Sequence, residues 1–513
     1  FFQFFLPKCV TNADLSNMGV LKNILYVSCA LFVVAFTLLM HRSDDVLMSF
    51  GNMYHEVLLE KRSTKHSHQY FSVSGFLHPS NWMHSGKSCG YTQFDVKAMR
   101  KECPKVYVYD PPHGFGLANV NRLAKDEVFG ETLSNKNVIG LRDTNQFHLA
   151  RVLTYRILHS QCHTTDPDEA DLFMFALALG DDRPVKYYPH HHCYVRDNFA
   201  KFAAHFRYLN ATTAQRHFIV NGYHWPTARW KCFDLGDVNK TADTQAHALL
   251  VSIPWINIEV RWEPIQGQWF PLLASGLHFQ EYLCGGLSKQ WQMKGLIRNV
   301  DCHGAIVNMP RPGCLHWSRH LLQHGVHKPW VQNVTPKDIL LSYVGRTAKF
   351  GKSGYKERLP VRQLCEKYEA SNGNKFICSE FGGCEATYHL KSRSLFCLDP
   401  VGDSPGRRST VDSYAVGCIP VFIGVVQAFL YPEQWSGWHD SAFLVLDKDR
   451  FVQGLDDPVE LLEAIPTETV KHMQAQIAQH APRFFYNEEE LSDVEDGVDF
   501  LLRGLHARSR TNM

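Results

Sequence analysis

Short apolar runs alternate with amphipathic stretches in two parts of the chain. In the first part the apolar runs have strand length, and the stretches between them have helical periodicity. The predicted elements are strands at 106–109, 172–179 and 218–220 and helices at 146–160 and 195–209. Strands that alternate with helices form a parallel, doubly wound sheet. The pattern therefore predicts one α/β unit over residues 103–335.

The second part repeats this alternation from residue 336 to residue 485. Its predicted strands are 339–344, 375–378, 395–398, 418–424 and 442–446, and its predicted helices are 356–368, 405–416, 457–464 and 467–480. Residues 231–325, which precede this part, are rich in Gly, Pro and Trp and are expected to form long loops. Residues 486–513 are expected to form a last helix that packs back on the first unit.

The N-terminal region has a different pattern. Residues 24–40 are a run of 17 uncharged residues, longer than the apolar core of a usual signal peptide and near the lower length limit of a membrane span. We expect an uncleaved signal anchor that binds the membrane, with residues 1–23 as a cytoplasmic tail and residues 41–102 as a polar stem. A cleaved signal peptide is the alternative.

Composition narrows the class of protein further. A chain of 513 residues with 45% hydrophobic residues is long enough for two globular domains. The net charge is +2, and no basic stripe with interleaved aromatic residues is present, so nothing indicates nucleic acid as a partner.

Cysteines and sequons are consistent with an oxidising lumen. Of the 15 cysteines, Cys9 and Cys29 precede or lie in the apolar run, so 13 follow it, and many of these should pair. An odd number leaves at least one free thiol, for which Cys397 and Cys418, inside apolar strands, are the best candidates. The sequons lie at Asn210, Asn239 and Asn333.

The turn after the strand at 395–398 is the most informative feature of the chain. Gly402 and Asp403 end the strand, Ser404 is the expected N-cap, and Pro405 suits the first helical position. A helix N-terminus beside a glycine turn binds anions through its unpaired N–H groups. Arg407 and Arg408 in the first turn would oppose the helix dipole unless an anion lies there.

Asp412 lies one turn after Arg408 on the same helix face. A carboxylate at that depth can accept hydrogen bonds from ribose hydroxyls. The alternative is an ordinary i,i+4 ion pair with Arg408 on a solvated face. Gly345 and Arg346 follow the strand at 339–344 and would bring another guanidinium group to the phosphates.

Residues 396–422, FCLDPVGDSPGRRSTVDSYAVGCIPVF, closely resemble the C-terminal signature of the exostosin-like glycosyltransferases, family 47, in its plant and algal branch, which includes xyloglucan galactosyltransferases. Four further blocks resemble that family in the same order: CPKVYVYDPP at 103–112, TDPDEADLF at 165–173, HFIVNG at 217–222 and LSYVGR at 341–346. The resemblance covers roughly residues 103–450. It implies a GT-B fold of two Rossmann-like domains and inverting transfer from a nucleotide sugar.

An inverting transfer needs a base on the acceptor side. Asp181, Asp182 and His224 follow strands of the first unit at their carboxyl ends, where open α/β sheets bind ligands. The alternative for Asp181 and Asp182 is a solvated turn. Residues 190–193, HHHC, lack a second half with zinc spacing and are interpreted as a surface loop, so we expect neither a metal nor another cofactor.

Tryptophans of the Gly- and Pro-rich region can either stack on acceptor sugars or pack in a core. They are Trp255, Trp262, Trp269, Trp291 and Trp317. The sequence thus predicts a Golgi type II glycosyltransferase that moves a sugar, galactose-like, from a UDP-sugar to a polysaccharide or glycoprotein glycan. A non-catalytic exostosin-like partner subunit and a glycan-binding protein are the alternatives, and assembly with a second copy or with related transferases stays open.

Overall fold

A computed structural model describes part of the chain. The described residues are 75–77, 96–110, 123–133, 140–177, 206–210, 212–221, 255–257, 262–265, 268–271, 306–331, 336–346, 355–369, 373–380, 383–402, 406–424, 427–428, 431, 433–434 and 442–511. The chain divides into Phe1–Gln69 and Tyr70–Met513, and every described residue lies in the second part.

The first sheet contains six parallel strands in the order β2-β1-β3-β4-β5-β8. They are β1 (Val106–Val108), β2 (His163–Thr164), β3 (Leu172–Leu177), β4 (His217–Asn221), β5 (Trp255–Asn257) and β8 (Ile306–Asn308). Helices α4 (Lys125–Phe129) and α5 (Leu149–Leu158) lie between the first strands in the chain, and the short 3-10 helix η2 (Ala214–Arg216) leads into β4.

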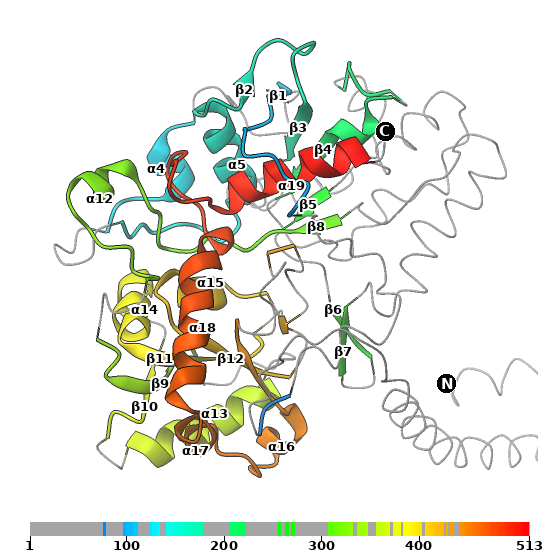
Figure 1. Ribbon diagram of the computed structural model, residues 1–513. Coiled ribbons are helices and arrows are strands. Elements are labelled where there is room, and N and C mark those ends of the chain that lie inside the picture. The colour runs from blue at the N-terminus through cyan, green and yellow to red at the C-terminus, as the bar shows by residue number, and fades with distance from the viewer. Residues whose placement is uncertain are drawn as a thin grey trace, which may run out of the picture. The chain divides into compact units, whose positions relative to one another are not determined.

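Side chains alternate between the two faces of this sheet, as a strand requires. One face, which includes Leu172, Met174 and Phe218, forms a core with α5 and with the C-terminal helix α19 (Gly497–Thr511). Arg156 of α5 donates to Asp496 and Asp499 over 3.2 Å each, which joins the two helices. The last helix of the chain is therefore part of the first sheet's core (Figure 1).

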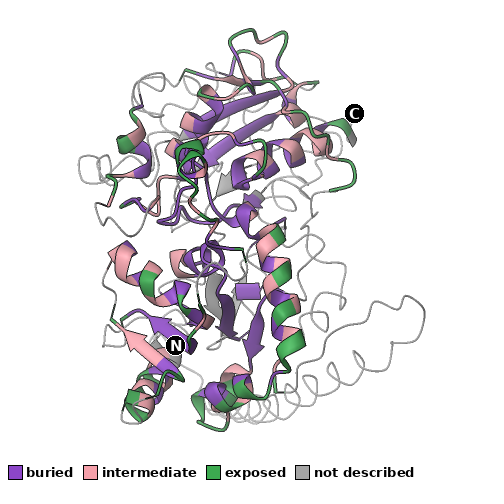
Figure 2. Ribbon diagram, turned by 60° about the vertical axis from the view of Figure 1, so that its left-hand side comes forward, coloured by how far each residue is buried: buried purple, intermediate pink, exposed green. Residues whose placement is uncertain are grey.

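The second sheet contains five parallel strands in the order β10-β9-β11-β12-β13. They are β9 (Ile339–Val344), β10 (Phe376–Ser379), β11 (Ser394–Asp399), β12 (Ile419–Ile423) and β13 (Leu444–Leu446). Its helices are α13 (Tyr355–Glu369), α14 (Gly383–Ser392), α15 (Arg408–Ala415), α16 (Lys448–Val452), α17 (Pro458–Glu463) and α18 (Thr467–His480). Figure 2 shows that its strands are largely buried and that α18 has one buried and one exposed side.

Two segments connect the sheets. After β8 the chain passes through the buried residues Met309–Trp317 and helix α12 (Arg319–Gln323) to β9. After α18 it returns through the 3-10 helix η7 (Ala481–Phe484) to α19. The core of the second sheet also contains Leu141, Cys314, Leu315 and Trp317, which shows that the two cores meet at the first of these segments.

Residues 231–325 contain more regular structure than the expected long loops. Strands β5 and β8 extend the first sheet, and β6 (Trp262–Ile265) pairs with β7 (Gln268–Pro271) as an antiparallel hairpin. The sequence did not predict these strands because three or four residues are too few to show a hydrophobic periodicity in a region rich in Gly, Pro and Trp. Helix α12 also lies in this region.

The expectation that Cys397 and Cys418 are free thiols was wrong. The two residues form a disulfide that joins β11 to the residue directly before its neighbour β12, with a Cα–Cα distance of 5.9 Å. Apolar strand sequence favoured free buried thiols, but parallel pairing of the strands brings these two positions together. Among the described residues, three further disulfides join Cys103 to Cys162, Cys314 to Cys384 and Cys365 to Cys378.

The expected anchor at 24–40 lies outside the described residues, as does most of the predicted stem. Among the helices of the described residues, none is long and apolar enough to cross a membrane.

The packing of α19 gives a direct prediction. Phe500, which is fully buried in the first sheet's core, should cost about 3–5 kcal/mol of unfolding free energy when changed to Ala. Leu455, which is 59% exposed, is the control, and Leu455→Ala should cost less than about 0.5 kcal/mol. Urea unfolding measures both. Equal small losses would show that α19 does not contribute to that core.

Candidate anion site at the carboxyl ends of the second sheet

Helix α15 begins three residues later than the sequence predicted. Its N-cap is Arg407, with extended backbone angles (φ −131°, ψ 139°), and its first helical residue is Arg408. Ser404 is therefore not the N-cap, and Asp403, Ser404 and Pro405 lie outside the described residues. The Arg407 side chain does not cap the helix, so the N–H groups in the first turn of α15 do not donate to this side chain.

The C-terminal side of this helix follows the prediction. Gly417, with φ of +65°, comes directly after the C-cap residue Val416, which is the position where a left-handed residue ends a helix. The chain then enters β12 next to β11. The strand, helix and strand expected around residues 394–424 are confirmed, and residues 403–405 of the turn lie outside the described residues.

Arginine side chains gather where β9 and β11 end. A Cβ atom on Gly402 would lie 3.1 Å from Nη2 of Arg358 and 3.3 Å from Nε of Arg407. A Cβ atom on Gly345 would lie 3.5 Å from Nη2 of Arg407. Arg358 also donates to the carbonyl of Arg346 over 3.4 Å. Arg358 and Arg407 thus lie beside Gly402, Arg407 also lies near Gly345, and Arg346 follows Gly345 directly in the chain.

Two arginines of this cluster, Arg346 and Arg407, form no ion pair with a carboxylate of the described residues. Arg407 donates instead to the carbonyl of Pro400 over 2.8 Å. Burial raises the pKa of the Tyr343 phenol, while the guanidinium groups of Arg407 and Arg358 act in the opposite sense. An anion at this edge would be stabilised by both charges and by the N-terminus of α15.

A buried network fixes α15 against the end of β11. Lys391, 1% exposed, donates to Asp399 over 3.2 Å, to the Ser409 hydroxyl over 2.8 Å and to the Ser413 hydroxyl over 2.6 Å. Asp399, fully buried, also accepts from the hydroxyls of Ser409 and Ser413 over 2.5 Å and 2.9 Å. Burial lowers the pKa of Lys391, against the effect of the Asp399 carboxylate.

Arg408 and Asp412 connect this helix to the first unit. Nε of Arg408 lies 3.8 Å from Oδ2 of Asp412, but Asp412 is only 8% exposed, so the pair is not on a solvated face. Oδ1 of Asp412 accepts from the Cys314 N–H over 3.1 Å, and Arg408 donates to the carbonyl of Thr144 over 3.2 Å. Burial raises the pKa of Asp412. Through these contacts Asp412 helps to hold α15 against the first unit. Binding of ribose hydroxyls by Asp412 stays a prediction.

Several predicted residues fall outside the described part of the chain. They are Asp181, Asp182 and His224, the sequons at Asn239 and Asn333, and the segment 190–193. Asn210 is exposed, with its side-chain oxygen accepting from the N–H groups of Thr212 and Thr213 over 2.9 Å and 3.1 Å. Trp317 is fully buried against Trp330, so it packs in the core and does not stack on a sugar.

Sequence reasoning missed Arg358, Lys391 and Asp399. Arg358 lies in the expected helix, but nothing in its sequence neighbours distinguishes it from a solvated arginine. Lys391 is followed by Ser, Arg and Ser, which is typical of a surface turn. Asp399 lies inside the signature at 396–422, where nothing in the sequence indicates a buried carboxylate.

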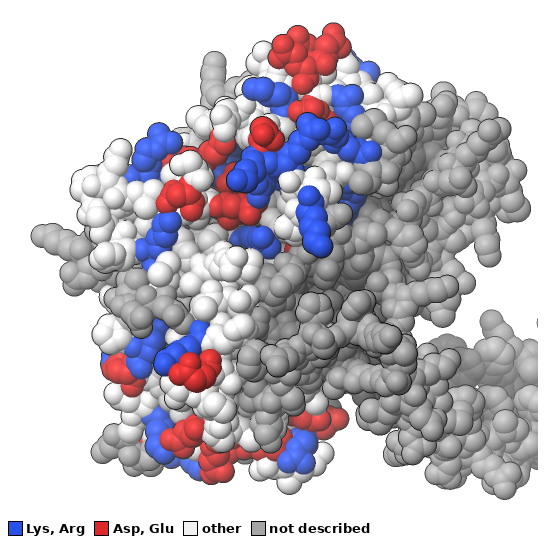
Figure 3. All heavy atoms as spheres, in the orientation of Figure 1, with Lys and Arg blue, Asp and Glu red and all other residues white. Residues whose placement is uncertain are grey.

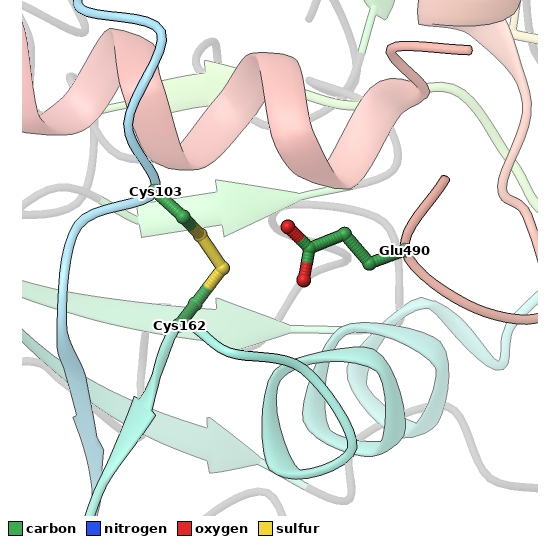
Figure 4. A group of neighbouring side chains, drawn as sticks. All are labelled: Cys103, Cys162 and Glu490. Atoms are coloured by element: carbon green, nitrogen blue, oxygen red, sulfur yellow. A yellow bond between two sulfur atoms is a disulfide. The ribbon is translucent and has the colours of Figure 1, made fainter. Parts of the chain in front are cut away.

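Two other groups of polar side chains do not form a comparable site. Cys103, Cys162 and Glu490 lie close together, but Figure 4 shows the two sulfur atoms joined in a disulfide, so neither is available as a thiolate ligand. Figure 3 shows acidic and basic side chains next to one another on the visible face of the described residues. Such neighbouring charges balance one another there, in contrast to Arg346 and Arg407.

Curated proteins of similar sequence confirm the resemblance to xyloglucan galactosyltransferases. Xyloglucan galactosyltransferase MUR3 of Arabidopsis thaliana is 32% identical over 168 residues, which are 29% of this chain and 26% of that protein. Xyloglucan galactosyltransferase XLT2 of the same plant is 29% identical over 446 residues, 80% of this chain and 75% of that protein. The alignments to the first three relatives span only 26%, 37% and 26% of their lengths.

No protein-family model matches the chain. Among solved structures, the pneumococcal O-GlcNAc transferase GtfA aligns with a TM-score of 0.26 and 12% identity, covering 56% of this chain and 57% of that one. The calicheamicin glycosyltransferase CalG4 aligns with a TM-score of 0.29 and 11% identity, covering 60% and 87%. At TM-scores this low, the likeness adds nothing to the fold described above.

The buried network predicts a large difference between two lysines. Lys391→Met leaves Asp399 as an uncompensated buried charge and should lower the free energy of unfolding by about 3–5 kcal/mol. Lys471, 61% exposed and paired with Glu468, is the control, and Lys471→Met should cost less than about 1 kcal/mol. Thermal unfolding at neutral pH measures both. A similar small loss for the two variants would contradict the network.

Proposed function

We propose that this protein is an inverting glycosyltransferase that binds a UDP-sugar at the carboxyl ends of β9 and β11. The observation that carries the proposal is the position of Arg346 and Arg407. Both are cations without a carboxylate partner among the described residues, at the edge of a parallel sheet where ligands bind. The similarity to xyloglucan galactosyltransferases supports the same reaction class.

The donor diphosphate would lie over Gly345 and Gly402. A Cβ atom on Gly345 would lie 2.7 Å from the Tyr343 hydroxyl, and one on Gly402 would lie 3.1 Å from Nη2 of Arg358. Because both positions are glycine, these side chains and the Arg407 guanidinium can lie close to the backbone at the ends of β9 and β11. The N–H groups at the start of α15 add partial positive charge to the same place. Arg358, which faces Gly402, is the third cation of this group.

The arrangement suits the chemistry of the leaving group. When the bond between the anomeric carbon and the diphosphate breaks, negative charge grows on the diphosphate, and fixed guanidinium groups stabilise that charge. The Lys391–Asp399 network holds α15, and hence Arg407 and Arg408, in place before the donor binds. Little reorganisation is then needed during the reaction.

The sugar, the acceptor and the location are proposed from weaker support. The names of the relatives favour galactose as the sugar and a xyloglucan-like polysaccharide as the acceptor. The two parallel α/β sheets fit the GT-B arrangement, with the first unit on the acceptor side. The apolar run at 24–40 supports a Golgi membrane protein whose catalytic region faces the lumen.

Changing Arg407 tests the donor site. Arg407→Ala should lower acceptor-dependent UDP release by about 10²–10³-fold, because charge on the leaving group loses a fixed cation. The assay uses a panel of UDP-sugars with xyloglucan oligosaccharides. Arg393→Ala is the control, since Arg393 is half exposed and pairs with Asp338 at the surface.

The same assay separates the alternatives. Acceptor-dependent release with one donor, lost in Arg407→Ala and kept in Arg393→Ala, would support the transferase and identify its sugar. UDP binding without turnover by the wild-type protein would favour a non-catalytic partner subunit. Glycan binding that does not depend on UDP would favour a glycan-binding protein.

A further inference from the structure

Glu433 is a buried carboxyl group that the donor site does not use. It lies in the connection between β12 and β13 and is only 1% exposed. Its Oε2 atom has no hydrogen-bond partner. A buried carboxyl oxygen without a partner is costly and is uncommon unless it serves a function.

The position of this connection brings Glu433 close to the first sheet. The next residue, Gln434, donates from its side-chain nitrogen to the sulfur of Met309 over 3.1 Å. Met309 directly follows β8, at the carboxyl end of that strand. Glu433 follows the end of β12 by ten residues, and the contact of Gln434 with Met309 places this part of the connection at the carboxyl end of β8. Open α/β sheets bind ligands at the carboxyl ends of their strands.

The surroundings of Glu433 bring the pKa of its carboxyl group close to neutral pH. Burial raises the pKa of Glu433 to about 7, and the Arg508 guanidinium of α19 acts in the opposite sense. Arg508 is the charged group of another described element that acts on this carboxyl, and burial lowers the pKa of Arg508 in turn. A carboxyl group that titrates near the working pH is well suited to take up and release a proton.

We propose that Glu433 is the general base of the transfer, an inference that rests on the proposed function. The acceptor hydroxyl would donate its hydrogen bond to the unpartnered Oε2 of Glu433. As the acceptor oxygen forms its bond to the anomeric carbon, its proton passes to Oε2, the bond between that carbon and the diphosphate breaks, and the diphosphate leaves with the electron pair. Glu433 then returns the proton to solvent.

This assignment differs from the bases expected from the sequence. Asp181, Asp182 and His224 belong to the first unit, whereas Glu433 comes from a connection of the second. A purely structural role, in which Glu433 attracts Arg508 and so holds α19, is the competing explanation. The two roles differ in their effect on the pH dependence of the rate.

The variant Glu433→Gln keeps the shape of the side chain and removes the base. We expect kcat to fall by about 10²–10⁴-fold, with UDP affinity unchanged within about twofold. In the wild-type protein, kcat should rise with pH through a limb near the pKa of about 7, and Glu433→Gln should lose this limb. Glu468→Gln, whose side chain is 83% exposed, is the control and should change neither quantity.

A second variant tests the same group without removing it. Arg508→Met removes a cation that lowers the pKa of Glu433, so the acid limb should move to higher pH while activity at high pH is retained. If Glu433→Gln does not fold, the wild-type limb and its shift in Arg508→Met decide the question. A wild-type rate without an acid limb, or a limb that Arg508→Met leaves in place, would overturn the proposal.

The outcomes separate this inference from the proposed function. If the wild-type protein transfers a sugar and Glu433→Gln is equally active, only the role of Glu433 is wrong. If both variants lose stability and the pH profile keeps its shape, Glu433 is structural. If the wild-type protein shows no transfer with any UDP-sugar, the proposed function fails and this role fails with it.

Discussion

The buried ion pair between Lys391 and Asp399 is the interaction on which the proposed donor site depends. It places a cation and an anion inside the second unit, where each would be strongly destabilising alone. The hydroxyls of Ser409 and Ser413 satisfy the remaining hydrogen bonds of the pair, and both belong to α15. The network therefore fixes the start of α15 relative to β11. Arg407 and Arg408 lie at that start. The network of Lys391, Asp399 and the two serines therefore helps to position both arginines, although its own members are not proposed to contact the donor.

The same helix is also joined to the first unit. Asp412 accepts from the Cys314 N–H, and Arg408 donates to the Thr144 carbonyl. Cys314 is also joined to Cys384 of α14 by a disulfide. A further buried contact joins Nδ1 of His316 to the Tyr486 carbonyl over 2.7 Å, near the return to α19. The proposed anion site thus lies in the second unit, and its helix α15 is held by contacts with the first unit. We infer that changes in the first unit near Thr144 or Cys314 alter donor binding without any contact with the donor.

The sequence predicted the parallel α/β units and the strand and helix on either side of the turn, because hydrophobic periodicity, glycine positions and apolar runs are local signals. It placed the helix start at Pro405 with Ser404 as N-cap, since Ser followed by Pro is a local capping pattern, whereas the helix begins at Arg408, next to the contact of Ser409 with Asp399. Lys391, Arg358 and the disulfide of Cys397 with Cys418 depend on contacts between elements, which local patterns do not contain. Strands β5 and β8 are too short to show a period among Gly, Pro and Trp.

A crystal structure of the protein with UDP bound tests the central claim most directly. The account predicts diphosphate oxygens within about 3.2 Å of the Arg407 guanidinium and of N–H groups in the first turn of α15, beside Gly345 and Gly402. It also predicts that the contacts of Lys391 with Asp399, Ser409 and Ser413 are the same with and without UDP. A diphosphate bound at the first sheet, or one that leaves Arg407 without a contact, would contradict it.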